Sequence, residues 1–146
     1  MTDAVKMASA YLRNGKVFLR PVSRTTQGSW RASDPVLLAS ESDKDLGSKV
    51  LDVLSRSMQG VPERAPEKEH DDPMLKAAGL RSFNAFSDFA KCVSVSMDDD
   101  EVTLTPTKNG GPRNRFLFLG AKKIKCRAST AEVDTALRNA FDACER

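Results

Sequence analysis

The chain contains little of the material from which an active site is usually built. Its 146 residues include one histidine, His70, and no Gly-x-Ser-x-Gly sequence accompanies it, as a serine hydrolase of that type would need. The cysteines lack the spacing of a zinc site. Gly110-Gly111 is followed by Pro112, where a phosphate-binding loop has lysine and then serine or threonine. The sequence therefore predicts no catalytic residues, no metal site and no cofactor, in a protein that is not an enzyme.

Long apolar runs and paired cysteines are also missing. No stretch comes close to the ~20 apolar residues of a membrane helix, and the N-terminus lacks the apolar core of a secretory signal. The three cysteines are widely spaced and form no C-x-x-C pair, which favours buried free thiols in a reducing compartment. We therefore expect a cytoplasmic protein that does not bind a membrane.

One structural pattern occurs twice in the chain. Val, Leu and Pro stand at the same alternate positions in Val17-Phe18-Leu19-Arg20-Pro21 and in Val102-Thr103-Leu104-Thr105-Pro106. In each copy a turn-rich stretch, a second apolar strand and an amphipathic helix follow. The sequence therefore predicts an α+β fold. It would be a mainly antiparallel sheet with helices packed on it, in two β-rich/helix halves related by a weak internal repeat.

The first half is predicted to contain two strands and a helix. Residues 11–23 alternate well enough for one strand, and residues 35–39 form its return strand. Ser42, with an acid three residues later, is typical of a helix N-cap, and the helix is expected to end near Gly60. Its buried face would consist of Leu46, Val50, Val53, Leu54 and Met58.

The second half is predicted to open with a helical turn at residues 74–78. Phe83, Phe86 and Phe89 follow at i, i+3 and i+6, which indicates a stripe that faces the core. Residues 93–105 alternate as a hairpin around an aspartate-rich turn. Two strands and a last helix complete the chain: a fully apolar strand at 116–119, an alternating strand at 124–128, and a helix that starts at the capping box of Ser129 and Glu132.

At this length the chain is expected to fold as one domain. Residues 1–10 would form an N-terminal arm and residues 11–59 the first half. Residues 60–73 hold three prolines, eight charged or histidine residues and almost nothing to bury, so they predict an exposed linker. Residues 74–146 would contain the short helix and the second half.

Charge is unevenly distributed, although the net charge is only +3. Residues 34–101 carry 15 acidic and 8 basic side chains, whereas residues 102–131 carry 7 basic and no acidic ones. Basic strand regions could bind phosphates, so a small nucleic-acid-binding or regulatory module stays open as an alternative function. The few aromatic residues mostly have core spacing, however, and a surface that stacks RNA bases needs exposed rings.

A family resemblance extends over about residues 11–145. The segments that carry it are Tyr11–Val17 with Pro21–Thr26, Gly28 and Trp30; Ala78–Phe83 with Phe86, Phe89 and Val93–Val95; Glu101–Pro106; and the terminal helix from Leu137 to Cys144. In these segments the chain resembles the immunity proteins of bacterial contact-dependent growth inhibition systems (CdiI-type, formerly a domain of unknown function).

The resemblance implies a non-catalytic protein that binds the C-terminal toxin domain of an adhesin, in a 1:1 complex, and covers its active or substrate-binding face. Many such toxins are nucleases, and a nuclease cleft must be cationic to hold phosphates. An acidic inhibitor surface would therefore favour association. We predict that the toxin, and not nucleic acid, contacts acidic residues of the linker and the second hairpin turn, with the Arg24–Trp30 loop as the next candidate. These acidic residues are Glu67, Glu69, Asp71, Asp72, Asp98, Asp99, Asp100 and Glu101.

Overall fold

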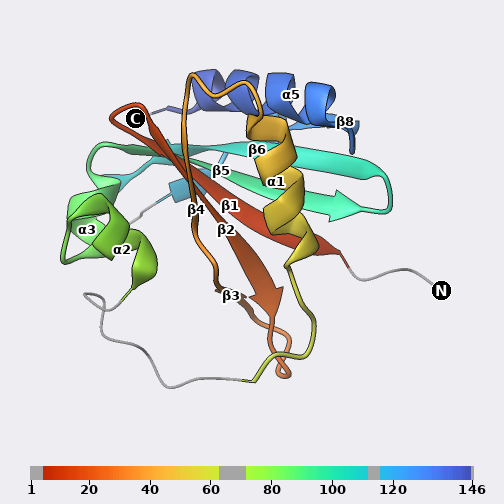
Figure 1. The fold of residues 1–146 in the computed structure, drawn as a ribbon, viewed down its shortest axis with the longest axis horizontal. Coiled ribbons are helices and arrows are strands. Elements are labelled where there is room, and N and C mark those ends of the chain that lie inside the picture. Colours follow the sequence, from red (N-terminus) through yellow and green to blue (C-terminus); the bar gives the residue numbers. More distant parts are fainter. Residues whose placement is uncertain (1–4, 63–71, 112–115, 146) are drawn as a thin grey trace.

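The computed structural model describes residues 5–62, 72–111 and 116–145, which form a curled antiparallel sheet with helices packed on it (Figure 1). The hydrogen-bonded order is β3-β2-β1-β5-β6-β7, and in addition β4 pairs with β2 and β8 pairs with β6. The predicted α+β class is confirmed. The strands are β1 (Lys6–Arg13), β2 (Lys16–Arg24), β3 (Trp30–Ala32), β4 (Leu37–Ser40), β5 (Ala90–Asp98), β6 (Glu101–Asn109), β7 (Phe116–Phe118) and β8 (Ile124–Arg127).

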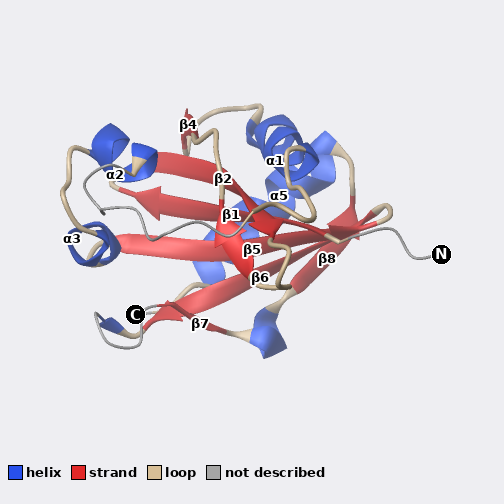
Figure 2. Cartoon of the chain, turned by 90° about the horizontal axis from the view of Figure 1, so that it is seen from below, coloured by secondary structure: helices blue, strands red, loops and turns tan. Residues whose placement is uncertain are grey.

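The two faces of the sheet are buried against different helices. α1 (Leu46–Ser55) and α5 (Thr130–Ala143) lie on one face and form the main core with alternate residues of β1, β2, β5 and β6. α2 (Pro73–Ala78) and α3 (Phe83–Ser87) cover only one end of the opposite face (Figure 2). Within the described ranges, no helix combines the length and the apolarity that crossing a membrane requires.

The predicted internal repeat is present as two similarly connected halves. The hairpins β1-β2 and β5-β6 meet where β1 pairs with β5, at the centre of the sheet. β4 pairs with the start of β2 as β8 pairs with the start of β6, and β3 and β7 pair with the ends of the same two strands. A backbone hydrogen bond recurs beside each hairpin turn: Glu41 N–H donates to the Gly15 carbonyl at 3.0 Å, and Ala128 N–H donates to the Asp100 carbonyl at 2.9 Å.

The first hairpin begins earlier and turns sooner than predicted. β1 starts at Lys6, inside the segment that we expected to be an N-terminal arm. Residues 11–23, predicted as one strand, contain the hairpin turn, where Asn14 and Gly15 have φ values of 52° and 76°. An Asn-Gly pair tolerates positive φ at both positions, so it closes a two-residue turn that matches the twist of the strands.

The start of α1 also differs from the prediction. Its N-cap is Asp45, whose side chain makes no capping bond, whereas Ser42, the predicted cap, shares a hydrogen bond with the Ser40 hydroxyl. The Ser40 N–H donates to the Asp43 carboxylate at 2.9 Å, and this bond is the main reason why the pKa of Asp43 is lowered. The side chains of residues 40–43 thus stabilise a turn, and the helix begins only at Leu46.

The end of α1 is earlier than predicted as well. The helix ends at Ser55 rather than near Gly60, because the residues after it bond to β2. The Ser57 hydroxyl donates to a β2 carbonyl at 2.6 Å, and the Met58 N–H donates to a β2 hydroxyl at 3.0 Å. Met58, predicted on the buried face, is 57% exposed.

Phe89, predicted in the core, is exposed, and so is Phe118 of the apolar strand predicted at 116–119. Phe83 and Phe86 join the aromatic cluster under α3, but that helix ends at Ser87 and Phe89 is 59% exposed, with the Arg13 guanidinium carbon 5.9 Å from its ring centre. Phe118 is 69% exposed because β7 is an edge strand.

The three cysteines are free thiols. Burial raises the pKa of Cys92 to about 12 and also raises the pKa values of Cys126 and Cys144. All three thiols are therefore protonated at neutral pH, and none has the lowered pKa of a reactive cysteine.

Truncation of one core leucine is expected to be strongly destabilising. Leu54 in α1 and Leu137 in α5 are fully buried between the helices and the sheet. Leu54→Ala or Leu137→Ala should lower the free energy of unfolding by about 2–5 kcal/mol, measured by urea denaturation. Leu38→Ala is the control, because this β4 side chain is mostly exposed. Unchanged stability of either core variant would contradict the packing of that helix.

Candidate functional site

The turn between β5 and β6 brings four consecutive acidic residues to one exposed tip. Asp98 and Glu101 form the last pair of the hairpin, and Asp99, with φ 54°, lies in the turn between them together with Asp100. All four are exposed. Among the described residues, Glu101 is the one of the four whose side chain has an ion pair, with Lys125 at 3.6 Å. Three neighbouring carboxylates without a cationic partner in the described residues repel one another, so their side-chain charges oppose the stability of the turn.

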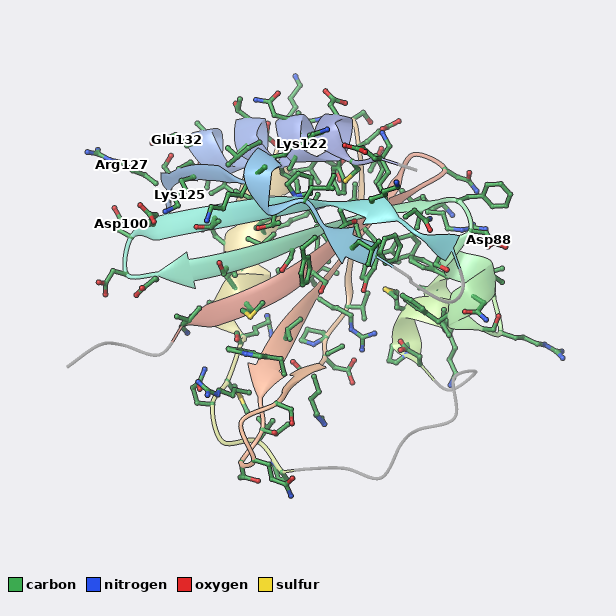
Figure 3. All side chains as sticks on the ribbon, turned by 180° about the vertical axis from the view of Figure 1, so that it is seen from behind. Asp88, Asp100, Lys122, Lys125, Arg127 and Glu132 are labelled. Carbon is green, nitrogen blue, oxygen red and sulfur yellow. The ribbon has the colours of Figure 1, made fainter. Side chains whose placement is uncertain are left out.

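The acidic turn borders a shallow groove of about 580 Å³, here called the acidic groove. Its other wall comes from β8 and from the first turn of α5, where Lys125, Cys126, Arg127 and Glu132 line it. Figure 3 shows Asp100, Lys125, Arg127 and Glu132 gathered at one end of the molecule, with Asp88 at the other end. The lining contains five carboxylates and two cations, so the groove is acidic at neutral pH.

Glu132 is held in place by the start of α5. Its carboxylate accepts hydrogen bonds from the Arg127 N–H and the Ser129 hydroxyl, both at 3.3 Å. Cys126 lines the groove as well, and its pKa is raised first by burial and then by the nearby Glu132 charge. The groove therefore contains a protonated thiol and no activated nucleophile. No three His, Cys, Asp or Glu side chains in the described ranges are placed to hold a metal ion.

Asp72, the linker residue of the predicted site that the structure describes, is bound by other residues of the protein. Its carboxylate forms two hydrogen bonds of 3.0 Å with the Arg20 guanidinium, and it also caps α2 by accepting the Met74 N–H at 2.8 Å. Its side chain is 31% exposed. Asp72 therefore has a structural role. The other predicted linker residues, Glu67, Glu69 and Asp71, lie outside the described residues.

Sequence reasoning identified the acidic turn but not the residues across the groove. Lys125, Arg127 and Glu132 are more than twenty positions away along the chain, and only the pairing of β6 with β8 brings them to the turn. The internal repeat contains a signal for this pairing. Residues 35–39 are predicted to pair with the strand that contains residues 17–21. By analogy, residues 124–128 should pair with the strand that contains residues 102–106.

The structure describes five basic side chains of residues 102–131, and all of them are exposed: Lys108, Lys122, Lys123, Lys125 and Arg127. Lys122 and Lys125 form ion pairs with Glu145 and Glu101. The interaction with Lys122 lowers the pKa of Glu145. Arg20, one of the basic residues of the first half, is buried and bound to Asp72. In the described part of the chain, Arg20 and the basic side chains of residues 102–131 therefore do not form one continuous cationic surface of free side chains.

Comparison with known proteins shows which fold this is. No protein-family model matches the chain, and no curated protein sequence matches it. Two solved structures match it over nearly their whole length. A protein of unknown function from Neisseria meningitidis has a TM-score of 0.79 at 13% identity, and the match covers 99% of this chain and 98% of that one. A chain of the CdiA-CT/CdiI toxin and immunity complex from Yersinia pseudotuberculosis has a TM-score of 0.72 at 17% identity, and the match covers 99% of this chain and 100% of that one.

Proposed function

We propose that this protein is an immunity protein, which binds and neutralises the C-terminal toxin domain of a contact-dependent growth inhibition adhesin. The observation that carries the proposal is the full-length likeness in fold to a chain of a toxin and immunity complex. The sequence resemblance favours the immunity side of such a complex for this chain. The protein would act in the cytoplasm without catalysis, in a 1:1 complex with the toxin.

The proposed mechanism is occlusion guided by charge. Asp98, Asp99, Asp100 and Glu101 would face a cationic cleft of the toxin, which is expected if the toxin is a nuclease. Charges of opposite sign accelerate encounter and discriminate against wrong partners. The turn suits this role because it is exposed and its aspartates have no ion pair within the described ranges. Binding there would cover the substrate-binding face of the toxin.

The proposal expects the reading frame immediately upstream to encode an adhesin that ends in a toxin domain, and the direct test uses that domain. We expect the two purified proteins to form a 1:1 complex, and expression of this protein to protect cells that produce the toxin domain. The purified protein alone should leave tRNA and duplex DNA intact. Absence of both binding and protection, or nuclease activity of the protein itself, would overturn the proposal.

Neutralising the acidic turn should slow toxin binding. The variant Asp98→Asn, Asp99→Asn, Asp100→Asn is expected to reduce the association rate about tenfold at low salt, and less at moderate salt where charges are screened. Asparagine accepts the positive φ of residue 99, so the turn should keep its shape. Surface plasmon resonance at two salt concentrations measures both effects.

A matched control removes the same charge elsewhere. Asp52, Asp88 and Asp142 are also exposed, and the triple change of these residues to asparagine should alter association less than twofold if the position of the charge matters. If both triple variants bind like the parent protein, the interface lies elsewhere, and the Arg24–Trp30 loop is the next surface to test.

A nucleic-acid-binding module is the second candidate, and the exposed ring of Phe118 is the observation that favours it. Phe118 belongs to residues 102–131, which carry seven basic and no acidic side chains, and an exposed aromatic side chain can stack on an unpaired base. Fluorescence anisotropy with bulk tRNA at low salt separates the two functions. If the parent protein binds tRNA and both Phe118→Ala and Lys123→Ala lose this binding, the nucleic-acid-binding function is supported. If the parent protein does not bind tRNA, this second candidate is rejected and the immunity function is retained.

A further inference from the structure

A second hollow lies beside the acidic groove, between the edge strand β8 and helix α5. Its volume is about 400 Å³, and we call it the apolar groove. Ile124 and Cys126 of β8 form one wall, and Ala131, Thr135 and Ala136 of α5 form the other. Most of its lining is carbon, so water gains few hydrogen bonds there.

Small side chains on α5 keep this groove open. The larger residues of the helix, Val133, Leu137 and Phe141, turn toward the main core. The flank toward β8 carries Ala131 and Thr135, both exposed, which are too short to cover the strand. Apolar atoms of β8 thus stay accessible in a hollow large enough for the side chain of a partner.

The apolar groove is continuous with the acidic groove. Cys126 and Glu132 line both hollows, so an occupant of one lies against the rim of the other. Beyond Glu132 the acidic groove leads to Asp98, Asp99 and Asp100, which have no ion pair within the described ranges. The combined surface therefore has an apolar end and a negatively charged end, and this charge selects the kind of partner.

We propose that the apolar groove receives an apolar side chain of the toxin, from a segment whose neighbouring basic side chain lies in the acidic groove. This inference rests on the proposed function and adds to it the chemistry of the contact. The charged end would govern the rate of encounter, whereas burial of the apolar side chain would govern the rate of dissociation. The two contributions can therefore be measured separately.

The first experiment tests the groove without the toxin. Three acetylated peptides are titrated into the methyl-labelled protein: one leucine followed by two arginines, the same peptide with serine for leucine, and the same peptide with glutamates for the arginines. The leucine–arginine peptide should shift the methyl signals of Ile124, Ala131, Thr135 and Ala136 in a saturable way. Its apparent Kd should be at least threefold lower than that of either other peptide. Absence of saturable shifts, or equal shifts with all three peptides, would overturn the inference.

The second experiment fills the groove. Thr135→Phe places a ring in the hollow from an exposed position, and Ser48→Phe places the same ring on the exposed face of α1 as a control. Thr135→Phe should abolish the peptide shifts and raise the dissociation rate of the toxin complex at least tenfold, with the association rate within twofold of the parent value. Ser48→Phe should change neither. Thermal denaturation confirms that both variants are folded.

The outcomes separate the two proposals. If the toxin binds the parent protein and Thr135→Phe equally, the groove inference is wrong and the immunity function stands. If the toxin does not bind the parent protein at all, the immunity function fails. If the peptides still bind the groove in that case, the occupant of the groove is not the toxin, and the groove inference is overturned as well.

Discussion

Replacement of Gly47 by alanine is expected to lower the free energy of unfolding by about 3 kcal/mol or more, although alanine is the better helix former. A β-carbon at this position would lie 2.0 Å from the Thr130 carbonyl oxygen and 2.9 Å from the Asp134 backbone nitrogen. Both atoms belong to the backbone of α5, so no side-chain rotation can remove the clash. Helix propensity alone would favour alanine by about 1 kcal/mol, and the clash must overcome that gain.

The clash is costly because α1 and α5 both pack in the main core. α1 and α5 bury their apolar faces against each other and against the sheet, including Leu46, Val50 and Leu137. Moving the helices apart by the required distance would loosen packing around all of these side chains at once. Urea denaturation measures the loss. Ser48→Ala, one residue along α1 and exposed, is the control and should be neutral or slightly stabilising.

A Gly47→Ala variant as stable as the parent protein would contradict the close approach of α1 and α5. The expected loss of stability would also explain why a glycine, a poor helix former, occupies position 47 in α1. Nothing in the local sequence requires it, since its backbone is helical, and only the crossing of a second helix far along the chain excludes a side chain there.

The parts of the fold that local chemistry determines could be predicted from the sequence. The last helix starts where expected, because the Ser129 hydroxyl accepts the Glu132 N–H at 3.2 Å. The hairpin of β5 and β6 follows from alternating apolar residues on either side of the aspartates. Asn14-Gly15 is also a strong turn signal, but the alternation of residues 11–23 continues across it and predicts one strand instead of a hairpin.

The features that could not be predicted depend on contacts between distant segments. The end of α1 is set by hydrogen bonds from Ser57 and Met58 to β2. Phe89 has core spacing, yet α3 ends before it and the ring is exposed. At the candidate site the acidic turn was visible in the sequence, whereas its opposite wall depends on the pairing of β8 with β6.

The contacts of Asp72 also could not be read from the sequence, because an acid in a linker and an acid that pairs with a buried arginine look alike there. Asp72→Ala is expected to lower the free energy of unfolding by about 3 kcal/mol, since it removes the bidentate partner of Arg20, whose side chain is only 7% exposed. The remaining partners of that guanidinium are longer contacts: the Asp34 carboxylate at 3.4 Å and the Ser33 carbonyl at 3.3 Å. The N-cap of α2 would be lost as well.

A double-mutant cycle separates the cost of the buried charge from the cost of the cap. Arg20→Met combined with Asp72→Ala should be more stable than Asp72→Ala alone, because the variant without the guanidinium leaves no buried cation without its main partner. Urea denaturation of the four proteins provides the coupling energy. Equal stability of the single and double variants would show that the cap, and not the ion pair, is the main contribution of Asp72.

If the proposed immunity function holds, the same variants test whether Asp72 also contacts the toxin, as predicted from the sequence. Because its carboxylate is bound by Arg20 and by the Met74 N–H, Asp72→Ala should bind the toxin at the parent association rate when assayed at a temperature where the variant is folded. The Asp98–Asp100 variant should show the opposite behaviour, with slowed association and little loss of stability. If Asp72→Ala slowed association while still folded, the toxin interface would extend from the acidic turn to the end of the linker.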